Sequence, residues 1–259
     1  MSDLVLKDIT MRFGGLVAVN KLDMEIAEGE IHSLIGPNGA GKTTVFNMIT
    51  GVYEPSEGTI TYAEKKLNKL SPHKIISLGI ARTFQNIRLF KSMTVLENVA
   101  VGMHCRTKSG AIRALLKTRY EIREEKEITR KSFEILDSLN LIRHANEYAS
   151  NLPYGEQRRL EIARAMATEP KTLLLDEPAA GMNPVETVDL MKDIIKLRDL
   201  GLTVFLVEHD MKVVMGISDK ITVLDHGSKI AEGTPKDIQN DSKVIEAYLG
   251  SEYAKAQTG

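Results

Sequence analysis

Residues 36–44 read Gly36-Pro37-Asn38-Gly39-Ala40-Gly41-Lys42-Thr43-Thr44. This stretch fits the phosphate-binding loop pattern: a glycine, four residues, a second glycine, a lysine, and then a serine or threonine. Glycines let backbone amides close around phosphate oxygens without interference from a Cβ atom. Lys42 is placed to reach the β- and γ-phosphates, and the Thr43 hydroxyl is placed to ligate Mg²⁺. The stretch therefore predicts a site for a nucleoside triphosphate.

The residues on either side of the loop support this interpretation. Ile31 to Ile35 form an apolar run of strand length before it. Apolar residues at helical spacing follow it, namely Val45, Phe46, Met48 and Ile49, and Gly51 then ends the predicted helix. Because a helix N-terminus carries partial positive charge, it adds to the attraction for phosphate.

The composition is that of a globular protein. The chain has 259 residues, 42% of them hydrophobic and 27% charged, which predicts one large domain or a core with a subdomain. The net charge of −1 gives no general attraction to nucleic acid or to an anionic membrane. The single cysteine, Cys105, excludes an internal disulfide and a zinc site built on cysteines.

The lengths of the apolar runs indicate whether the chain crosses a membrane or carries a signal peptide. None approaches the about 18 residues needed to cross a membrane. The N-terminal residues Met1 to Leu4 lack the apolar core of a signal peptide. We therefore expect a cytoplasmic protein with no transmembrane segment.

Periodicity elsewhere predicts layered α/β structure. Residues 21–26 alternate between charged and apolar types, which is typical of a half-exposed antiparallel strand. Residues 172–175 and 203–207 are continuous apolar runs, typical of buried parallel strands. Asn183, Pro184 and Glu186 form the start signal of a helix that ends at Gly201. The predicted fold class is α/β, with a mostly parallel sheet and an antiparallel N-terminal part.

Residues 86–167 differ, because helical signals dominate there. Thr94 and Glu97 have the spacing of a capping box, and Glu127 and Lys131 that of an i,i+4 ion pair. We expect a helical subdomain at 86–167, inserted into an α/β core at 1–85 and 168–235. Residues 221–231 read as a hairpin, 236–259 as a C-terminal tail, and the last residues, from about Ser251 to Gly259, as a frayed end. The basic stretch Arg106–Arg119 is either a solvated face or a contact with lipid headgroups or a partner.

Polar residues follow three of the predicted strands. Asp176 and Glu177 end the run that begins at Leu173; Asp176 suits an Mg²⁺ shell, and Glu177 can orient or deprotonate an attacking water. His209 follows 203–207, where it can bridge the γ-phosphate and a carboxylate, and Asp210 is interpreted as a helix cap. Gln85 follows Ile80–Phe84, where its amide can ligate Mg²⁺ and sense the γ-phosphate.

The order and spacing of these motifs resemble ABC-transporter ATP-binding cassettes. The motifs are residues 36–44, Gln85, 152–159, 173–177 and His209. The resemblance implies a P-loop NTPase (RecA-like) fold with an inserted helical subdomain. The stretch 152–159 reads Leu152-Pro153-Tyr154-Gly155-Glu156-Gln157-Arg158-Arg159 and matches the family signature. In that family the signature closes over ATP bound by a partner cassette, which here implicates Tyr154, Gly155 and Glu156.

The chain departs from the family pattern at several positions. Pro153 replaces the signature serine, Tyr154 replaces the first signature glycine, and Glu156 stands where glutamine is usual. Asn183 stands where aspartate is usual, and it can still cap the next helix. Phe13 matches the aromatic residue that stacks on adenine in the family; a buried strand-end phenylalanine is the alternative.

Further segments narrow the resemblance to LivG-type ATPases of branched-chain amino acid importers. They are 82–90, 93–98, 154–165, 179–184, 208–212 and 244–250. That type implies a paired ATPase, two membrane permeases and an extracytoplasmic amino-acid-binding protein, with this chain peripheral on the cytoplasmic face of the membrane. The alternatives are another cargo, such as urea, other amino acids or an exported lipid, and a non-transport ABC protein acting on ribosomes or DNA.

The resemblance and the residues together predict a complete site for ATP and Mg²⁺. The catalytic residues are Glu177, His209 and Lys42, and the metal ligands are Thr43, Gln85 and Asp176. The residues expected to bind ATP are Phe13, Asn38, Gly39, Ala40, Gly41, Lys42, Thr43 and Thr44. We expect ATP to close the dimer, hydrolysis to open it, and the motion to pass through Gln85 and 86–98 to the permease.

Overall fold

The computed structural model describes residues 2–103 and 119–248, and its main layer is a six-stranded sheet. The strands lie in the order β10-β9-β3-β8-β7-β6, and only the β9–β10 pair is antiparallel. Their bounds are β3 Ile31–Ile35, β6 Ile80–Arg82, β7 Thr172–Asp176, β8 Thr203–Val207, β9 Lys220–Asp225 and β10 Ser228–Gly233. Strands β3, β7 and β8 are buried along their whole length, as their continuous apolar runs predicted.

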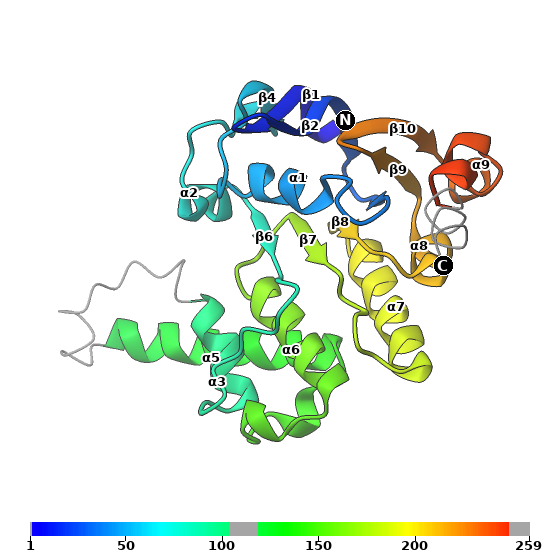
Figure 1. The fold of residues 1–259 in the computed structure, drawn as a ribbon. Coiled ribbons are helices and arrows are strands. Elements are labelled where there is room, and N and C mark those ends of the chain that lie inside the picture. The colour runs from blue at the N-terminus through cyan, green and yellow to red at the C-terminus, as the bar shows by residue number, and fades with distance from the viewer. Residues whose placement is uncertain (1, 104–118, 249–259) are drawn as a thin grey trace.

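A second sheet, entirely antiparallel, covers the first helix. Its order is β2-β1-β4-β5, with β1 Ser2–Phe13, β2 Leu16–Ala27, β4 Glu57–Tyr62 and β5 Lys65–Lys66. Helix α1 (Lys42–Ile49) lies between the two sheets, and Figure 1 shows it in blue beneath β1 and β2. In this layer the Phe46 ring packs 4.9 Å from the Phe205 ring of β8. Burial of both rings anchors α1, and with it the end of the preceding loop.

Helices cover the other face of the six-stranded sheet. They include α7 (Pro184–Asp199), α8 (Met211–Ile217) and α9 (Pro235–Gln239), and residues 242–248 form a further helix. The predicted cap of α7 is confirmed, because Asn183 accepts from the amides of Val185 and Glu186. The cap of α8 is also confirmed, because Asp210 accepts from the amide of Lys212.

The helical region lies between two neighbouring strands of the sheet. The chain leaves β6 and returns through β7 after α3 (Val95–Met103), α5 (Arg119–Ser138), η2 (Ile142–His144), η3 (Ala149–Asn151) and α6 (Tyr154–Met166). A short helix, α2 (Pro72–Ser77), precedes β6. One buried apolar cluster runs from β7 and β8 into α3, α5 and α6, so the helical region is packed onto the sheet. Figure 1 shows this region in green below the sheets.

Two local predictions were made for the helical region, a capping box and an ion pair, and the structure contains only the first as a direct contact. The capping box is confirmed: the Thr94 amide donates to Glu97 at 2.7 Å, and the Glu97 amide donates to Thr94 at 3.2 Å. The Glu127–Lys131 pair does not form as a direct contact, although the charge of Lys131 helps to lower the pKa of Glu127. Glu127 instead pairs with Arg130 one turn away, and the Lys131 ammonium pairs with Glu169 from the segment after α6. Glu127 thus takes a partner on its own helix, whereas Lys131 takes one that only tertiary packing brings near.

The predicted fold class is confirmed: the core is α/β with a mostly parallel sheet, and a helical part is inserted between β6 and β7. The predicted hairpin is also confirmed as β9–β10. Cys105, the basic stretch from Arg106 to Lys117 and the end from Ser251 lie outside the described residues, and of Arg119 only the backbone is described. Within the described ranges, no helix is both long enough and apolar enough to span a bilayer.

Candidate nucleotide-binding site

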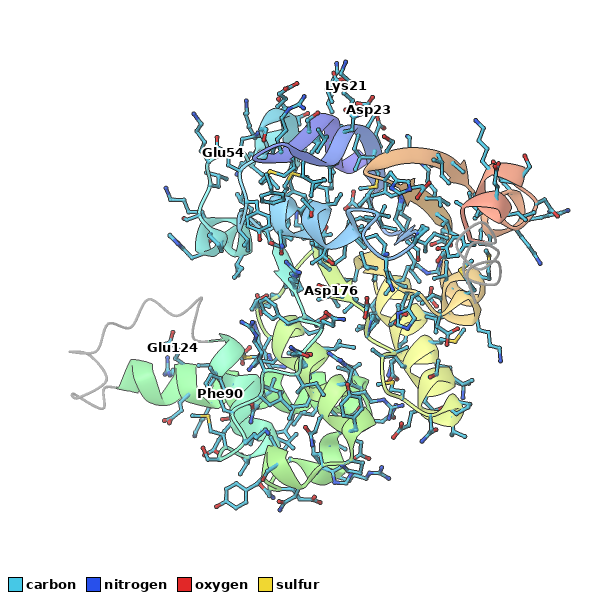
Figure 2. All side chains as sticks on the ribbon, in the orientation of Figure 1. Lys21, Asp23, Glu54, Phe90, Glu124 and Asp176 are labelled. Atoms are coloured by element: carbon cyan, nitrogen blue, oxygen red, sulfur yellow. The ribbon has the colours of Figure 1, made fainter. Side chains whose placement is uncertain are left out.

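The residues predicted to act on the nucleotide meet at one edge of the six-stranded sheet. Strands β3, β6, β7 and β8 are parallel, so their carboxyl ends lie at the same edge. The loop 36–41 follows β3, Gln85 follows β6, Glu177 follows β7 and His209 follows β8. Figure 2 shows Asp176, the last residue of β7, in the middle of the molecule between the sheets and the helical region.

Two glycines allow the loop 36–41 to pack against the sheets. Gly36 has φ 151°, and a Cβ atom there would lie 2.0 Å from the Leu224 carbonyl oxygen of β9. Gly41 has φ 101°, and a Cβ atom there would lie 2.5 Å from the Ala18 carbonyl oxygen of β2. No side chain fits at either position without moving backbone. The loop is therefore held close against β9 and β2, and it ends at the N-terminus of α1.

Lys42 lies inside this loop. Its Nζ donates to the Gly36 carbonyl at 2.7 Å and to the Pro37 carbonyl at 2.9 Å, and the side chain is buried. Burial lowers the pKa of the Lys42 ammonium, and the charges of Glu177 and Asp176 act in the opposite direction. The cradle of amides, the helix N-terminus and the ammonium fit a phosphate chain.

Arg82 holds Asp176, a contact that the sequence did not reveal. Its Nη2 donates to Asp176 Oδ2 at 2.7 Å, and its Nη1 donates to Asn47 at 2.8 Å and to Thr50 at 3.2 Å. Both members of the ion pair are largely buried. A charged residue in the short strand β6 was the available signal. Arg82 fixes the Asp176 carboxylate beside the end of α1, where a metal ligand was predicted.

Glu177, Gln85 and His209 converge as the sequence predicted. Gln85 Nε2 donates to Glu177 Oε2 at 2.8 Å, and His209 Nδ1 lies 3.8 Å from the same oxygen. Glu177 has φ 47°, which is uncommon for a residue with a side chain, and its amide donates to Val207 at 2.8 Å. Strained backbone of this kind is found preferentially where geometry serves function.

The predicted metal ligands offer oxygen atoms only. They are the Thr43 hydroxyl, the Gln85 amide oxygen and the Asp176 carboxylate, and the Gln85 amide group can bond to Glu177 while its oxygen stays available. Among the described residues there is no cluster of three or more His, Cys, Asp or Glu side chains that could hold a metal. A hard, oxygen-only donor set of this size fits Mg²⁺, which keeps several waters and binds substrate phosphates.

Glu208 is a second residue that sequence reasoning missed. It is 1% exposed, and its carboxylate accepts from the amides of Ala179 at 2.8 Å, His209 at 2.9 Å and Asp210 at 3.2 Å. It thus ties the loop after β7 to the loop after β8. The adjacent acidic residue before His209 was visible in the sequence, but its three partners were not.

The Glu208→Gln substitution is expected to destabilise the protein. An amide group offers one acceptor oxygen in place of two and turns a donor toward the backbone amides. We expect the free energy of unfolding to fall by about 1–3 kcal/mol, the cost of a buried unsatisfied polar group. Urea denaturation followed by circular dichroism measures it, with the exposed Glu57→Gln as control. Equal unfolding midpoints for both variants would contradict the role of Glu208.

Phe13 ends β1 and is not a buried strand-end residue. It is 41% exposed, and its ring meets Tyr53 edge to face at a centroid distance of 5.3 Å. The β1–β2 hairpin approaches the loop 36–41, since Ala18 of β2 contacts Gly41. An exposed aromatic face near the phosphate loop suits a base.

The three signature residues open helix α6, and each has a partner within the chain. The Tyr154 ring lies against Gly181, where a Cβ atom would be 3.2 Å from it. Gly155 faces Glu186 so closely that a Cβ atom would lie 2.8 Å from its carboxyl carbon. Glu156 pairs with Arg143 at 2.8 Å, and its other carboxylate oxygen lies 3.1 Å from His144 Nε2. Tyr154 remains 43% exposed.

Comparison with known proteins places this architecture among transport ATPases. A family model described as ABC transporter matches residues 19–180, and a model described as branched-chain amino acid ATP-binding cassette transporter matches 228–254. The chain is 52% identical over 248 residues to the high-affinity branched-chain amino acid transport ATP-binding protein LivG of Salmonella typhimurium, covering 95% of this chain and 97% of that protein.

Solved structures similar to this chain are also ATP-binding cassettes. The chain resembles the ADP conformation of MJ1267, an ATP-binding cassette of an ABC transporter, with a TM-score of 0.85 and 33% identity over 96% of this chain and 99% of that one. It also resembles a dimeric structure of the ATP-binding cassette MJ0796 in a post-hydrolysis state bound to ADP and Pi. There the TM-score is 0.74 and the identity 28%, over 90% of this chain and 98% of that one.

Proposed function

This chain belongs to the ABC transporter family, and on that premise we propose that it energises the uptake of branched-chain amino acids by hydrolysing ATP at the carboxyl edge of its sheet. As a cassette of that family it is an ATPase. The observation that carries the proposal is the convergence of Gln85 and His209 on the Glu177 carboxylate beside the phosphate loop.

The residues of the site divide the work of hydrolysis. The amides of residues 39–43 and the Lys42 ammonium hold the phosphates, and Phe13 stacks on the adenine. Lys42 exchanges the Gly36 and Pro37 carbonyls for phosphate oxygens. Glu177 accepts a proton from the attacking water or orients it, and His209 stabilises the transferring γ-phosphate.

Thr43, Gln85 and Asp176 would hold Mg²⁺, with Asp176 in its first or second shell. When bound, the ion neutralises charge on the β- and γ-phosphates. Arg82 holds the Asp176 carboxylate in place, and Gln85 retains its bond to Glu177 through the amide NH₂. The Gln85 side chain would therefore contact both Mg²⁺ and Glu177, so it would fix the position of the metal relative to the base.

A second cassette completes the site. Tyr154, Gly155 and Glu156 would face ATP held by the partner, with the N-terminal amides of α6 directed at the anion. The likeness to a cassette solved as a dimer supports this arrangement. The partner is either a second copy or a paired, similar ATPase.

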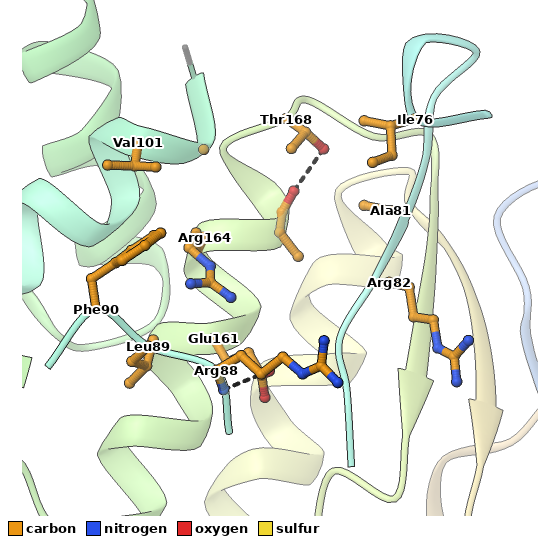
Figure 3. A pocket seen from close by; sticks show the side chains of 12 residues that line it. Ile76, Ala81, Arg82, Arg88, Leu89, Phe90, Val101, Glu161, Arg164 and Thr168 are labelled. Atoms are coloured by element: carbon orange, nitrogen blue, oxygen red, sulfur yellow. Dashed lines mark hydrogen bonds between the residues drawn. The ribbon is translucent and has the colours of Figure 1, made fainter. Parts of the chain in front are cut away.

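Permease subunits would dock on a groove between the sheet and the helical region. The groove encloses about 580 Å³, and its lining includes Ile76, Arg88, Phe90, Val101 and Arg164. Figure 3 shows Arg164 beside Phe90, and the guanidinium carbon lies 5.5 Å from the centroid of the Phe90 ring, which is 45% exposed. The segment after Gln85 forms one wall of this groove. A movement of a bound permease would therefore displace residues that lie next to Gln85. The chain would then sit on the cytoplasmic face of the membrane, linked through the permeases to an extracytoplasmic amino-acid-binding protein.

The test is transport by the host cell. Deleting this chain is expected to abolish uptake of radiolabelled leucine at low concentration, and the wild-type chain on a plasmid is expected to restore it. The tagged chain, purified from membranes in detergent, is expected to carry two permeases and an ATPase partner. Unchanged leucine uptake with loss of urea uptake or lipid export would overturn the cargo assignment.

A further inference from the structure

Arg158 is an arginine buried completely within the helical region. It lies in the second turn of α6 with 0% exposure, and it is the largest fully buried side chain among the residues that the structure describes. A buried guanidinium is costly unless its N–H groups find acceptors. The acceptors of Arg158 therefore show what the residue is there to hold.

Two of those acceptors are backbone carbonyls near the start of residues 83–94, the segment that carries Gln85. Nη1 donates to Phe84 at 2.8 Å, and Nη2 donates to Gln85 at 2.8 Å. The segment between β6 and α3 has no regular structure, so its backbone groups need side-chain partners. A planar fork on α6 meets this need at two adjacent residues.

Glu161 holds the same segment from the same helix. Its Oε2 accepts from Arg158 at 3.0 Å, and its Oε1 lies 3.4 Å from the amides of Phe84 and Arg88. Figure 3 shows the Glu161 carboxylate directed at the Arg88 backbone. Burial raises the pKa of Glu161, and Arg158 opposes that rise. Arg158 and Glu161 thus hold the segment together, Arg158 through backbone carbonyls and Glu161 through backbone amides.

Tyr154 joins this grip to the signature. Its hydroxyl accepts from Arg158 Nη2 at 3.2 Å, the nitrogen that also bonds to the Gln85 carbonyl. Its ring rests on Gly181, in the loop that follows Glu177. One side chain, standing where the family usually has glycine, therefore contacts the loop after Glu177 directly and is connected to the Gln85 carbonyl through Arg158.

We infer that Arg158 and Tyr154 are positioning residues that fix the backbone at Gln85, and so aim the Gln85 amide at Glu177 and at the metal position. The inference rests on the proposed role of Gln85 in ATP hydrolysis. It assigns the unusual signature tyrosine a task within its own chain, besides any contact with ATP of the partner. Displacement of the signature helix would then move Gln85.

The test compares Arg158→Lys and Tyr154→Phe in the full-length chain. Lysine keeps the charge that Glu161 faces but cannot form the planar fork, and phenylalanine removes only the hydroxyl. Arg130→Lys is the matched control, because Arg130 also pairs with glutamates on a helix of this region but is exposed. Hydrogen–deuterium exchange of residues 84–90 without nucleotide is the first measurement. Calorimetry of ATP binding, in EDTA and with Mg²⁺, is the second.

In Arg158→Lys we expect exchange in 84–90 to quicken by about tenfold, as two charge-assisted bonds are lost. Affinity for ATP with Mg²⁺ should fall by about three- to tenfold, and affinity in EDTA should stay within about twofold, because the phosphate loop is untouched. Tyr154→Phe should act in the same direction more weakly, and it decides the matter if Arg158→Lys does not fold.

Two results would overturn the inference. One is wild-type exchange and wild-type affinity in a folded variant. The other is an equal loss of affinity with and without Mg²⁺, which indicates a general structural defect. If the wild-type chain itself binds no ATP, the proposed function fails instead, and the exchange measurement still reports on the grip of Arg158.

Discussion

The Glu177→Gln variant is expected to bind ATP normally and to hydrolyse it about two to four orders of magnitude more slowly. Glutamine matches glutamate in shape but cannot accept a proton from water. Its amide oxygen can still accept the hydrogen bond that Gln85 Nε2 makes at 2.8 Å. The geometry around the base should therefore survive while its chemistry is lost.

Phosphate release by the assembled transporter measures the rate, and calorimetry with Mg²⁺ and ATP measures affinity. The control is Glu134→Gln, which removes a carboxylate from an exposed ion pair on α5. Slow turnover with retained affinity identifies Glu177 as the base or water orienter. Turnover near the wild-type rate would remove it from that role and direct attention to His209, which lies 3.8 Å away.

The Lys42→Ala variant is expected to lose ATP affinity by about 100-fold or more, since a buried ammonium that meets two phosphates makes charge-assisted bonds. The substitution also leaves the carbonyls of Gly36 and Pro37 without the donor that now bonds both. The loop should remain folded, because Gly36 and Gly41 also pack closely against β9 and β2, and these contacts do not involve Lys42.

Calorimetry without Mg²⁺ isolates this effect from the metal ligands. Lys65→Ala, on the exposed strand β5, is the matched control. Thermal unfolding of both variants separates lost binding from lost structure. Wild-type affinity in Lys42→Ala would contradict the assignment of residues 36–44 as the phosphate loop.

Much of the fold could be predicted because its signals are local. Continuous apolar runs located β7 and β8, and alternation located β2. Asn183 and Asp210 cap the helices that follow them, as their positions predicted. The Glu127–Lys131 pair failed, because Arg130 and Glu169 compete for the same partners and only the folded chain brings Glu169 near. The domain boundaries at 85/86 and 167/168 remain a prediction.

The sequence could predict which residues meet at the candidate site, but it could not predict which residues hold them in place. Gln85, Glu177 and His209 each follow a strand, and parallel strands bring their carboxyl ends together. Arg82, Glu208 and Arg158 gave no comparable signal. Each acts through partners in another segment, so the residue type alone did not distinguish it from a surface charge.

The sequence alone predicted a phosphate loop at 36–44, and it determined the strands and helix caps around it and the family of ATPases to which the chain belongs. These depend on interactions among residues a few positions apart. Only the tertiary structure decided how the site is held. Arg82 meets Asp176 across 94 residues, and Arg158 meets the Gln85 carbonyl across 73. Such contacts form only when the sheet and the helical region pack, because burial then obliges each charged group to find its partner.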